Sequence, residues 1–247
     1  LSVGAVMAIA AAVAATRLAD GGGLALAIVP ALAAGALVGG LNGWLVARER
    51  IQPIVVTLAT LIAGRGVAQV ISDDGQLVAV REAAFLALGR ERLGPVPVPV
   101  LVATAVVAVA AFVLARTVTG RHVLAVGGNP VAARLAGVPV TRTLVTVYVT
   151  AALLAALAGL LEAARLGAAD AAKIGLNIEL DAIAATVVGG TALRGGRATI
   201  VGTVLGALVL QVIATGFNML LVPYAWSLAI RAVLILLAVA VQRPPRA

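Results

Sequence analysis

Residues 98–117 read Val-Pro-Val-Leu-Val-Ala-Thr-Ala-Val-Val-Ala-Val-Ala-Ala-Phe-Val-Leu-Ala-Arg-Thr, with no charged residue before Arg116. An α-helix rises about 1.5 Å per residue, so about 20 such residues match the roughly 30 Å hydrocarbon core of a bilayer. The composition and length of this run therefore predict a membrane-spanning helix.

Similar apolar runs occupy much of the remaining chain, at 1–16, 24–47, 54–71, 141–161, 199–220 and 225–242. A further segment, 178–193, opens with Glu179 and Asp181 and ends in Gly189-Gly190. We expect it to form a short or re-entrant helix, which is tolerated at membrane depth only where protein or a water-filled cavity covers it. Together these segments predict an all-α, polytopic transmembrane helical bundle with a single transmembrane domain over residues 1–247.

The composition agrees with a membrane protein. Of the 247 residues, 62% are hydrophobic and 11% charged, and the mean hydropathy is +1.14. A soluble domain of this length cannot hide so much apolar surface. The net charge of +8 would indicate nucleic-acid binding in a soluble protein, but here the basic residues lie at the ends of apolar runs and we expect no nucleic acid. The absence of cysteine excludes disulfides and thiolate chemistry.

The basic residues also predict an orientation, because cytoplasmic loops carry more Lys and Arg than external ones. If 48–50, 116–142, 194–197 and the C-terminal tail are cytoplasmic, that side holds ten basic residues: Arg48, Arg50, Arg116, Arg121, Arg134, Arg142, Arg194, Arg197, Arg243 and Arg246. The opposite side holds six: Arg17, Arg81, Arg90, Arg92, Arg165 and Lys173. This alternation of loops requires segment 178–193 to cross the membrane.

The segment 127–138, Gly-Gly-Asn-Pro-Val-Ala-Ala-Arg-Leu-Ala-Gly-Val, separates two apolar runs. Pro130 suits the first turn of a helix, and Gly137 suits the position at which a helix ends. Helical spacing places Ala133, Ala136 and Gly137 on one face, where small residues allow another protein to approach closely. We expect a compact docking helix; the alternative is an ordinary interhelical loop.

Several motifs resemble one permease family. Asn42-Gly43 is followed by Ile51-Gln52-Pro53-Ile54-Val55-Val56-Thr57-Leu58 and by Ala63-Gly64-Arg65-Gly66-Val67-Ala68-Gln69. After segment 127–138 come Glu179-Leu180-Asp181-Ala182-Ile183-Ala184-Ala185 and Val188-Gly189-Gly190-Thr191-Ala192-Leu193-Arg194-Gly195-Gly196-Arg197. Their order resembles ABC-transporter permeases of the ribose/xylose/galactofuranose family, and is most similar to the galactofuranose permeases. Ile54 stands where that family has phenylalanine.

The resemblance implies a permease subunit of a binding-protein-dependent monosaccharide importer in the bacterial inner membrane. The implied partners are a cytoplasmic ABC ATPase, a periplasmic sugar-binding protein, a second permease in a homo- or heterodimer, and the lipid bilayer. Leu1-Ser2-Val3-Gly4 resembles the end of a family signature. Because family members have about ten helices, we expect about eight of ten here, with the N-terminal helices missing. Segment 127–138 would be the cytoplasmic coupling helix, with ATPase-coupling residues Gly127, Gly128, Asn129, Ala132, Ala133, Arg134, Ala136 and Gly137.

The chain carries no recognisable catalytic residues. It has no G-x-x-x-x-G-K-[ST] motif for binding ATP, and its single histidine, His122, cannot form a paired metal site or a catalytic triad. We therefore expect no enzyme activity, no metal and no cofactor in this chain, with ATP-Mg bound and hydrolysed by the partner ATPase.

Polar residues inside apolar runs are candidates for the substrate path: Asn42, Thr57, Thr60, Arg65, Gln69, Gln211 and Asn218, with Thr215 and Arg231 also noted. Thr57, Thr60 and Gly64 share one helical face. That face suits either a sugar path or helix–helix packing. Glu179 and Asp181 suit either a substrate gate or capping of a helix N-terminus.

Two other transport functions compete with sugar import. A branched-chain amino acid ABC permease has a related fold and coupling segment. A secondary transporter would need buried carboxylates at mid-membrane depth, and apart from Glu179 and Asp181 the sequence offers no candidates.

Overall fold

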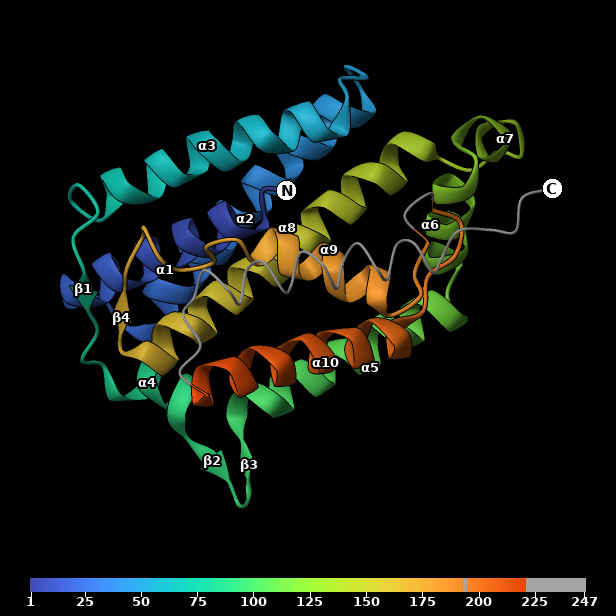
Figure 1. Ribbon diagram of the computed structural model, residues 1–247. Helices are drawn as coiled ribbons and strands as arrows, with labels where there is room; N and C mark the ends of the chain where they lie inside the picture. Colours follow the sequence, from blue (N-terminus) through green and yellow to red (C-terminus); the bar gives the residue numbers. More distant parts are fainter. Residues whose placement is uncertain (193–194, 221–247) are drawn as a thin grey trace. The chain divides into compact units, whose positions relative to one another are not determined.

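The computed structural model describes residues 1–192 and 195–220 (Figure 1). The described chain divides into two compact units. The first unit comprises Leu1–Val113 and Pro139–Glu179, and the second comprises Leu114–Val138 and the chain from Leu180 onward. The predicted run 225–242, Arg194, Arg231, Arg243 and Arg246 lie outside the described residues.

The first unit is mostly helical. Its helices are α1 (Val3–Ala19), α2 (Leu24–Ala47), α3 (Pro53–Ile71), α4 (Ala83–Arg90), most of α5 (Val98–Arg116) and α8 (Val140–Leu166). Two short antiparallel pairs join β1 (Val78–Ala79) to β4 (Ala168–Ala169), and β2 (Arg92–Leu93) to β3 (Val96–Pro97).

Helix α1 lies in the core of this unit, packed against α2, α3 and α8. Its alanine-rich sequence has small side chains on every face, so three helices approach it closely, and residues such as Ala8 and Ala12 are fully buried. On α8, Gly159 lies directly against the backbone of Met7, where a Cβ atom would collide. Small residues therefore determine how tightly this bundle packs.

A glycine ladder holds α2 against α8. Gly35, Gly39 and Gly43 recur every four residues, and a Cβ added at each would lie 2.7–2.8 Å from atoms of α8. This is the small-xxx-small pattern that lets membrane helices pack backbone to backbone.

The second unit contains α6 (Val118–Gly128), α7 (Pro130–Leu135), α10 (Ile200–Met219) and nearly all of α9 (Ile178–Val188). Helices α9 and α10 pack through glycines, because Gly202 lies against the Gly189 carbonyl and Gly206 against the Ala185 carbonyl. The threonine hydroxyls of Thr191 and Thr203 lie 3.2 Å apart beside this crossing.

The helical architecture is confirmed, but the expected number of eight membrane segments is not. In the described part of the chain, five helices are long and apolar enough to span a membrane: α2, α3, α5, α8 and α10. Helix α1 is a shorter apolar helix of 17 residues. The segment expected to cross at 178–193 forms an 11-residue helix, whose length of about 16 Å is about half the hydrocarbon core.

Candidate functional site: a capped surface helix and a buried polar cluster

Helix α7 is a single short helix that is closed at both ends. The Asn129 side-chain oxygen accepts hydrogen bonds from the backbone N–H groups of Val131 and Ala132, each at 3.0 Å, and Pro130 occupies the first turn. At the other end Gly137 has φ of +80°, and the Val138 N–H donates to the Ala133 carbonyl at 2.9 Å. This is a Schellman C-cap, and it confirms a compact helix starting at Pro130 and stopping before Gly137.

The exposed face of α7 differs from the expected one. Ala133 is 5% exposed, so it packs inward and does not join Ala136 and Gly137 on an open surface. The open surface instead carries Val131, 68% exposed, and Leu135, 86% exposed. These two residues are one helical turn apart and form an exposed apolar patch. The patch was not predicted, because helical spacing alone does not show which face of α7 packs against α6.

The other predicted coupling residues have separate places. Ala132, Arg134 and Ala136 are exposed. Gly127 and Gly128, at the end of α6, lie against the Gly195-Gly196 turn within the second unit, and a Cβ on Gly195 would collide with the Gly127 carbonyl. The glycines at 127 and 195 are thus explained by packing within the chain.

A partly buried hydrogen-bonded chain connects the first three helices. Asn42 of α2 is 1% exposed and donates through Nδ2 to Ser2 Oγ at 3.1 Å. The Thr60 hydroxyl of α3 lies 2.6 Å from Asn42 Oδ1 and 2.9 Å from the Val56 carbonyl. The structure therefore brings together two of the predicted substrate-path residues, Asn42 and Thr60.

The neighbouring residues on the same face of α3 contact protein. Thr57 is buried, and its hydroxyl donates to the Pro53 carbonyl at 2.9 Å. A Cβ on Gly64 would lie 2.9 Å from the Ala5 Cβ of α1. This arrangement matches the packing alternative for the face; a role in the substrate path stays a prediction.

Arg65 of α3 holds the loop that follows α8. Its guanidinium donates to the Ile174 carbonyl at 2.7 Å and to the Gly175 carbonyl at 2.6 Å, with the Ala171 carbonyl at 3.4 Å. A charged side chain at membrane depth must be satisfied by protein or water, and Arg65 is satisfied by this loop.

Two carboxylates balance the Arg65 charge. Glu179 is 8% exposed, and its Oε2 atom is buried without a hydrogen-bond partner among the described residues. A Cβ on Gly4 would lie 2.7 Å from that Oε2 and 2.9 Å from Arg65 Nη2, so both groups converge beside α1. Glu162 also attracts Arg65 electrostatically. It lies within α8, which extends beyond the predicted boundary at 161.

The remaining polar candidates are not gathered into this cluster. Gln69 is exposed on α3. On α10, Gln211 and Asn218 are exposed, and Gln211 Nε2 lies 3.4 Å from the Thr215 hydroxyl. Asp181 lies with Glu179 of the Arg65 cluster in the first turn of α9, where a carboxylate interacts favourably with the positive end of the helix dipole.

Comparisons with known proteins identify the family. The family model described as branched-chain amino acid transport system / permease component matches residues 1–239. The ribose import permease protein RbsC of Escherichia coli is 41% identical over 98% of this chain and 76% of its own length. The galactofuranose transporter permease protein YtfT of the same species is 40% identical over 98% of this chain and 71% of its length.

An L-arabinose permease, AraH of Azospirillum brasilense, is 38% identical over 97% of this chain and 70% of its own length. No solved structure matches. The resemblance drawn from the motifs is confirmed: the chain belongs to this permease family, and permeases named for ribose, galactofuranose and arabinose import are among its relatives.

Proposed function

We propose that this chain is the membrane-spanning permease subunit of a binding-protein-dependent ABC importer that translocates a monosaccharide, ribose-like or galactofuranose-like, across the bacterial inner membrane. The observation that carries the proposal is the identity of about 40% to sugar-import permeases over nearly the whole chain. The family description also mentions branched-chain amino acids, but these relatives are named for sugars, so sugar import is favoured.

Helix α7 would couple the permease to a cytoplasmic ABC ATPase. The exposed side chains of Val131 and Leu135 would be buried in a groove of the ATPase. Burial of each side chain contributes roughly 1.5–3 kcal/mol to the free energy of binding. The caps at Asn129 and Gly137 keep the short helix formed before docking, which reduces the entropy lost on binding. Arg134 is exposed beside the pair and would face an acidic group on the ATPase.

The ATPase would bind ATP-Mg and supply the energy, and this chain would carry no catalytic residues. A periplasmic sugar-binding protein would deliver the substrate, and a second permease would complete the path. The half-buried Arg65 would hold the 170–177 loop beside α3, and the buried Glu179 would offset the charge of Arg65.

The substrate class can be tested on the binding protein encoded beside this gene, by thermal shift with ribose, galactofuranose, arabinose and branched-chain amino acids. Stabilisation by a sugar supports the proposal. Stabilisation only by amino acids would replace it with the amino acid permease alternative.

A further inference from the structure

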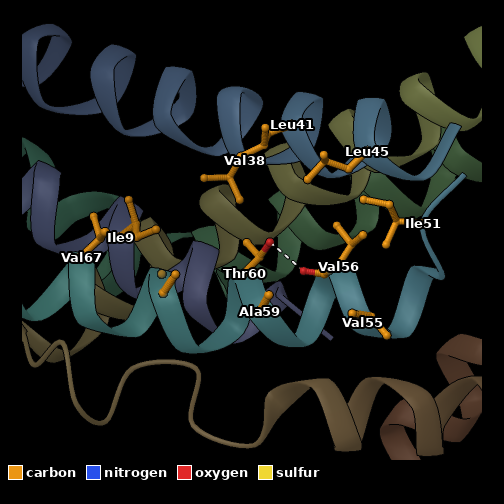
Figure 2. Close-up of a pocket in the computed structure, with 12 residues that line it drawn as sticks. Ile9, Val38, Leu41, Leu45, Ile51, Val55, Val56, Ala59, Thr60 and Val67 are labelled. Carbon is orange, nitrogen blue, oxygen red and sulfur yellow. Dashed lines mark hydrogen bonds between the residues drawn. The ribbon is translucent and has the colours of Figure 1, made fainter. Parts of the chain in front are cut away.

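An apolar groove runs between α2 and α3 in the first unit (Figure 2). It encloses about 500 Å³. Figure 2 shows its labelled lining residues: Ile9 of α1; Val38, Leu41 and Leu45 of α2; Ile51; and Val55, Val56, Ala59, Thr60 and Val67 of α3, with Ala63 and Gly64 completing the wall.

The groove offers almost nothing to a sugar. Among the described residues, Thr60 is the single polar one that lines the groove, and the Thr60 hydroxyl is already within hydrogen-bonding distance of Asn42 and the Val56 carbonyl. A monosaccharide would lose its hydrogen bonds to water without replacing them, whereas a hydrocarbon chain loses none. The chemistry of the walls therefore selects an apolar ligand.

A short basic loop lies at one end of the groove. Leu45 and Ile51 both line the groove, and the Ile51 N–H donates to the Leu45 carbonyl at 3.3 Å. The loop between them contains Arg48, Glu49 and Arg50, all exposed. Two arginines around one glutamate leave the loop with a net positive charge at the mouth of the groove.

A tryptophan marks the level of this end in the bilayer. Trp44 lies one turn before Arg48, whose N–H donates to the Trp44 carbonyl at 2.8 Å, and its side chain is 50% exposed. Exposed tryptophans of membrane helices gather at the headgroup level. The basic loop thus lies where lipid phosphates lie, and the groove extends from it into the hydrocarbon region.

We propose that this groove is a binding site for an anionic phospholipid, with an acyl chain between α2 and α3 and the headgroup phosphate at Arg48 and Arg50. A guanidinium binds phosphate oxygens through two parallel hydrogen bonds, which gives a defined site in addition to general attraction by the membrane surface. Basic side chains beside membrane helices favour anionic headgroups over zwitterionic ones.

The length of the groove suits one acyl chain. The lining residues of α3 run from Val55 to Val67, a distance of about 18 Å along the helix. This distance is close to the depth of one leaflet, which is half of the roughly 30 Å hydrocarbon core. The apolar groove of about 500 Å³ therefore suits a chain that runs from the headgroup level towards the centre of the bilayer.

The headgroup part of the site is tested by native mass spectrometry of the full permease–ATPase complex, titrated in detergent with phosphatidylglycerol or phosphatidylcholine. We expect preferential retention of phosphatidylglycerol. Each arginine should contribute about fivefold to affinity, so Arg48→Gln/Arg50→Gln should weaken phosphatidylglycerol binding about 25-fold. Arg116→Gln, an exposed arginine at the end of α5, is the matched control and should retain the lipid. Equal retention by the double variant and the control would overturn the proposal.

The acyl-chain part is tested by filling the groove. Ala59→Phe should reduce retention of phosphatidylglycerol, whereas Ala108→Phe, on an exposed face of α5, should not. Melting temperatures equal to that of the unsubstituted complex would show that neither variant is misfolded. Because the chain has no cysteine, Ala59→Cys provides a unique thiol. Efficient disulfide cross-linking between two permeases through that thiol would show that a second copy fills the groove and would overturn the lipid site.

Discussion

Replacing Arg65 with alanine should release the 170–177 loop from α3 and destabilise the permease by about 3–6 kcal/mol. The side chain makes two short hydrogen bonds, at 2.7 and 2.6 Å, to the Ile174 and Gly175 carbonyls. A hydrogen bond from a charged donor contributes roughly 1.5–3 kcal/mol, which gives the range above. The contact at 3.4 Å adds little.

The same change also removes a compensating positive charge from beside the buried Glu179 carboxylate. Because an uncompensated buried charge is strongly destabilising, the loss should lie towards the upper end of the range. Arg65→Lys should destabilise the permease less than Arg65→Ala does. An ammonium keeps the positive charge but cannot bridge two carbonyls as the planar guanidinium does. Arg65→Ala/Glu179→Gln should be more stable than Arg65→Ala alone.

The assay is thermal unfolding of the purified complex, where a loss of several kcal/mol should lower the melting temperature by roughly 10 °C. Arg90→Ala is the matched control. Arg90 also donates to two carbonyls, of Arg165 at 2.9 Å and Leu166 at 2.8 Å, but it is exposed, so water can replace it. A melting temperature for Arg65→Ala equal to that of Arg90→Ala, or strict additivity in the double variant, would refute this reasoning.

Three further changes test other parts of the structure. Leu135→Glu should weaken co-purification with the ATPase at least about tenfold, and Leu135→Met should preserve it, because the exposed apolar side chain is the proposed contact. Normal binding of the ATPase by the glutamate variant would show that α7 does not couple the two proteins. Gly39→Val should lower the melting temperature much more than Gly40→Val. A Cβ added at Gly39 would lie 2.7 Å from atoms of α8, whereas a Cβ added at Gly40 would have a single neighbouring atom, at 3.9 Å. Equal melting temperatures for the two variants would argue against the glycine ladder. Asn42→Ala should destabilise the complex by about 1–3 kcal/mol by breaking the link to Thr60, and an unchanged melting temperature would show that the link is unimportant.

The features predictable from sequence are those encoded locally. Apolar runs such as 98–117 predicted spanning helices because helix length and bilayer thickness are fixed, and five such helices are present in the described residues. The bounds of α7 followed from Pro130 and Gly137, whose backbone preferences act within one turn.

The features that sequence could not supply depend on tertiary contacts. The burial of Ala133 and the exposure of Leu135 are set by packing against α6, which helical spacing does not specify. The sequence identified Arg65 as a charged residue that is unfavourable at membrane depth, but its partners are backbone carbonyls more than 100 residues away. Every residue type has a backbone carbonyl, so the sequence does not indicate which ones Arg65 contacts. Segment 178–193 was expected to form a short or re-entrant helix, and its helix has 11 residues; its crossing of the membrane, which the charge alternation requires, stays a prediction.

ATP-driven sugar import is tested by uptake into proteoliposomes that contain the permease, its ATPase and its binding protein, using a radiolabelled sugar that stabilises that binding protein. We expect accumulation of the sugar that requires both ATP and the binding protein and that is abolished by Leu135→Glu. Accumulation without ATP, or driven by an ion gradient alone, would contradict it and assign the chain to secondary transport.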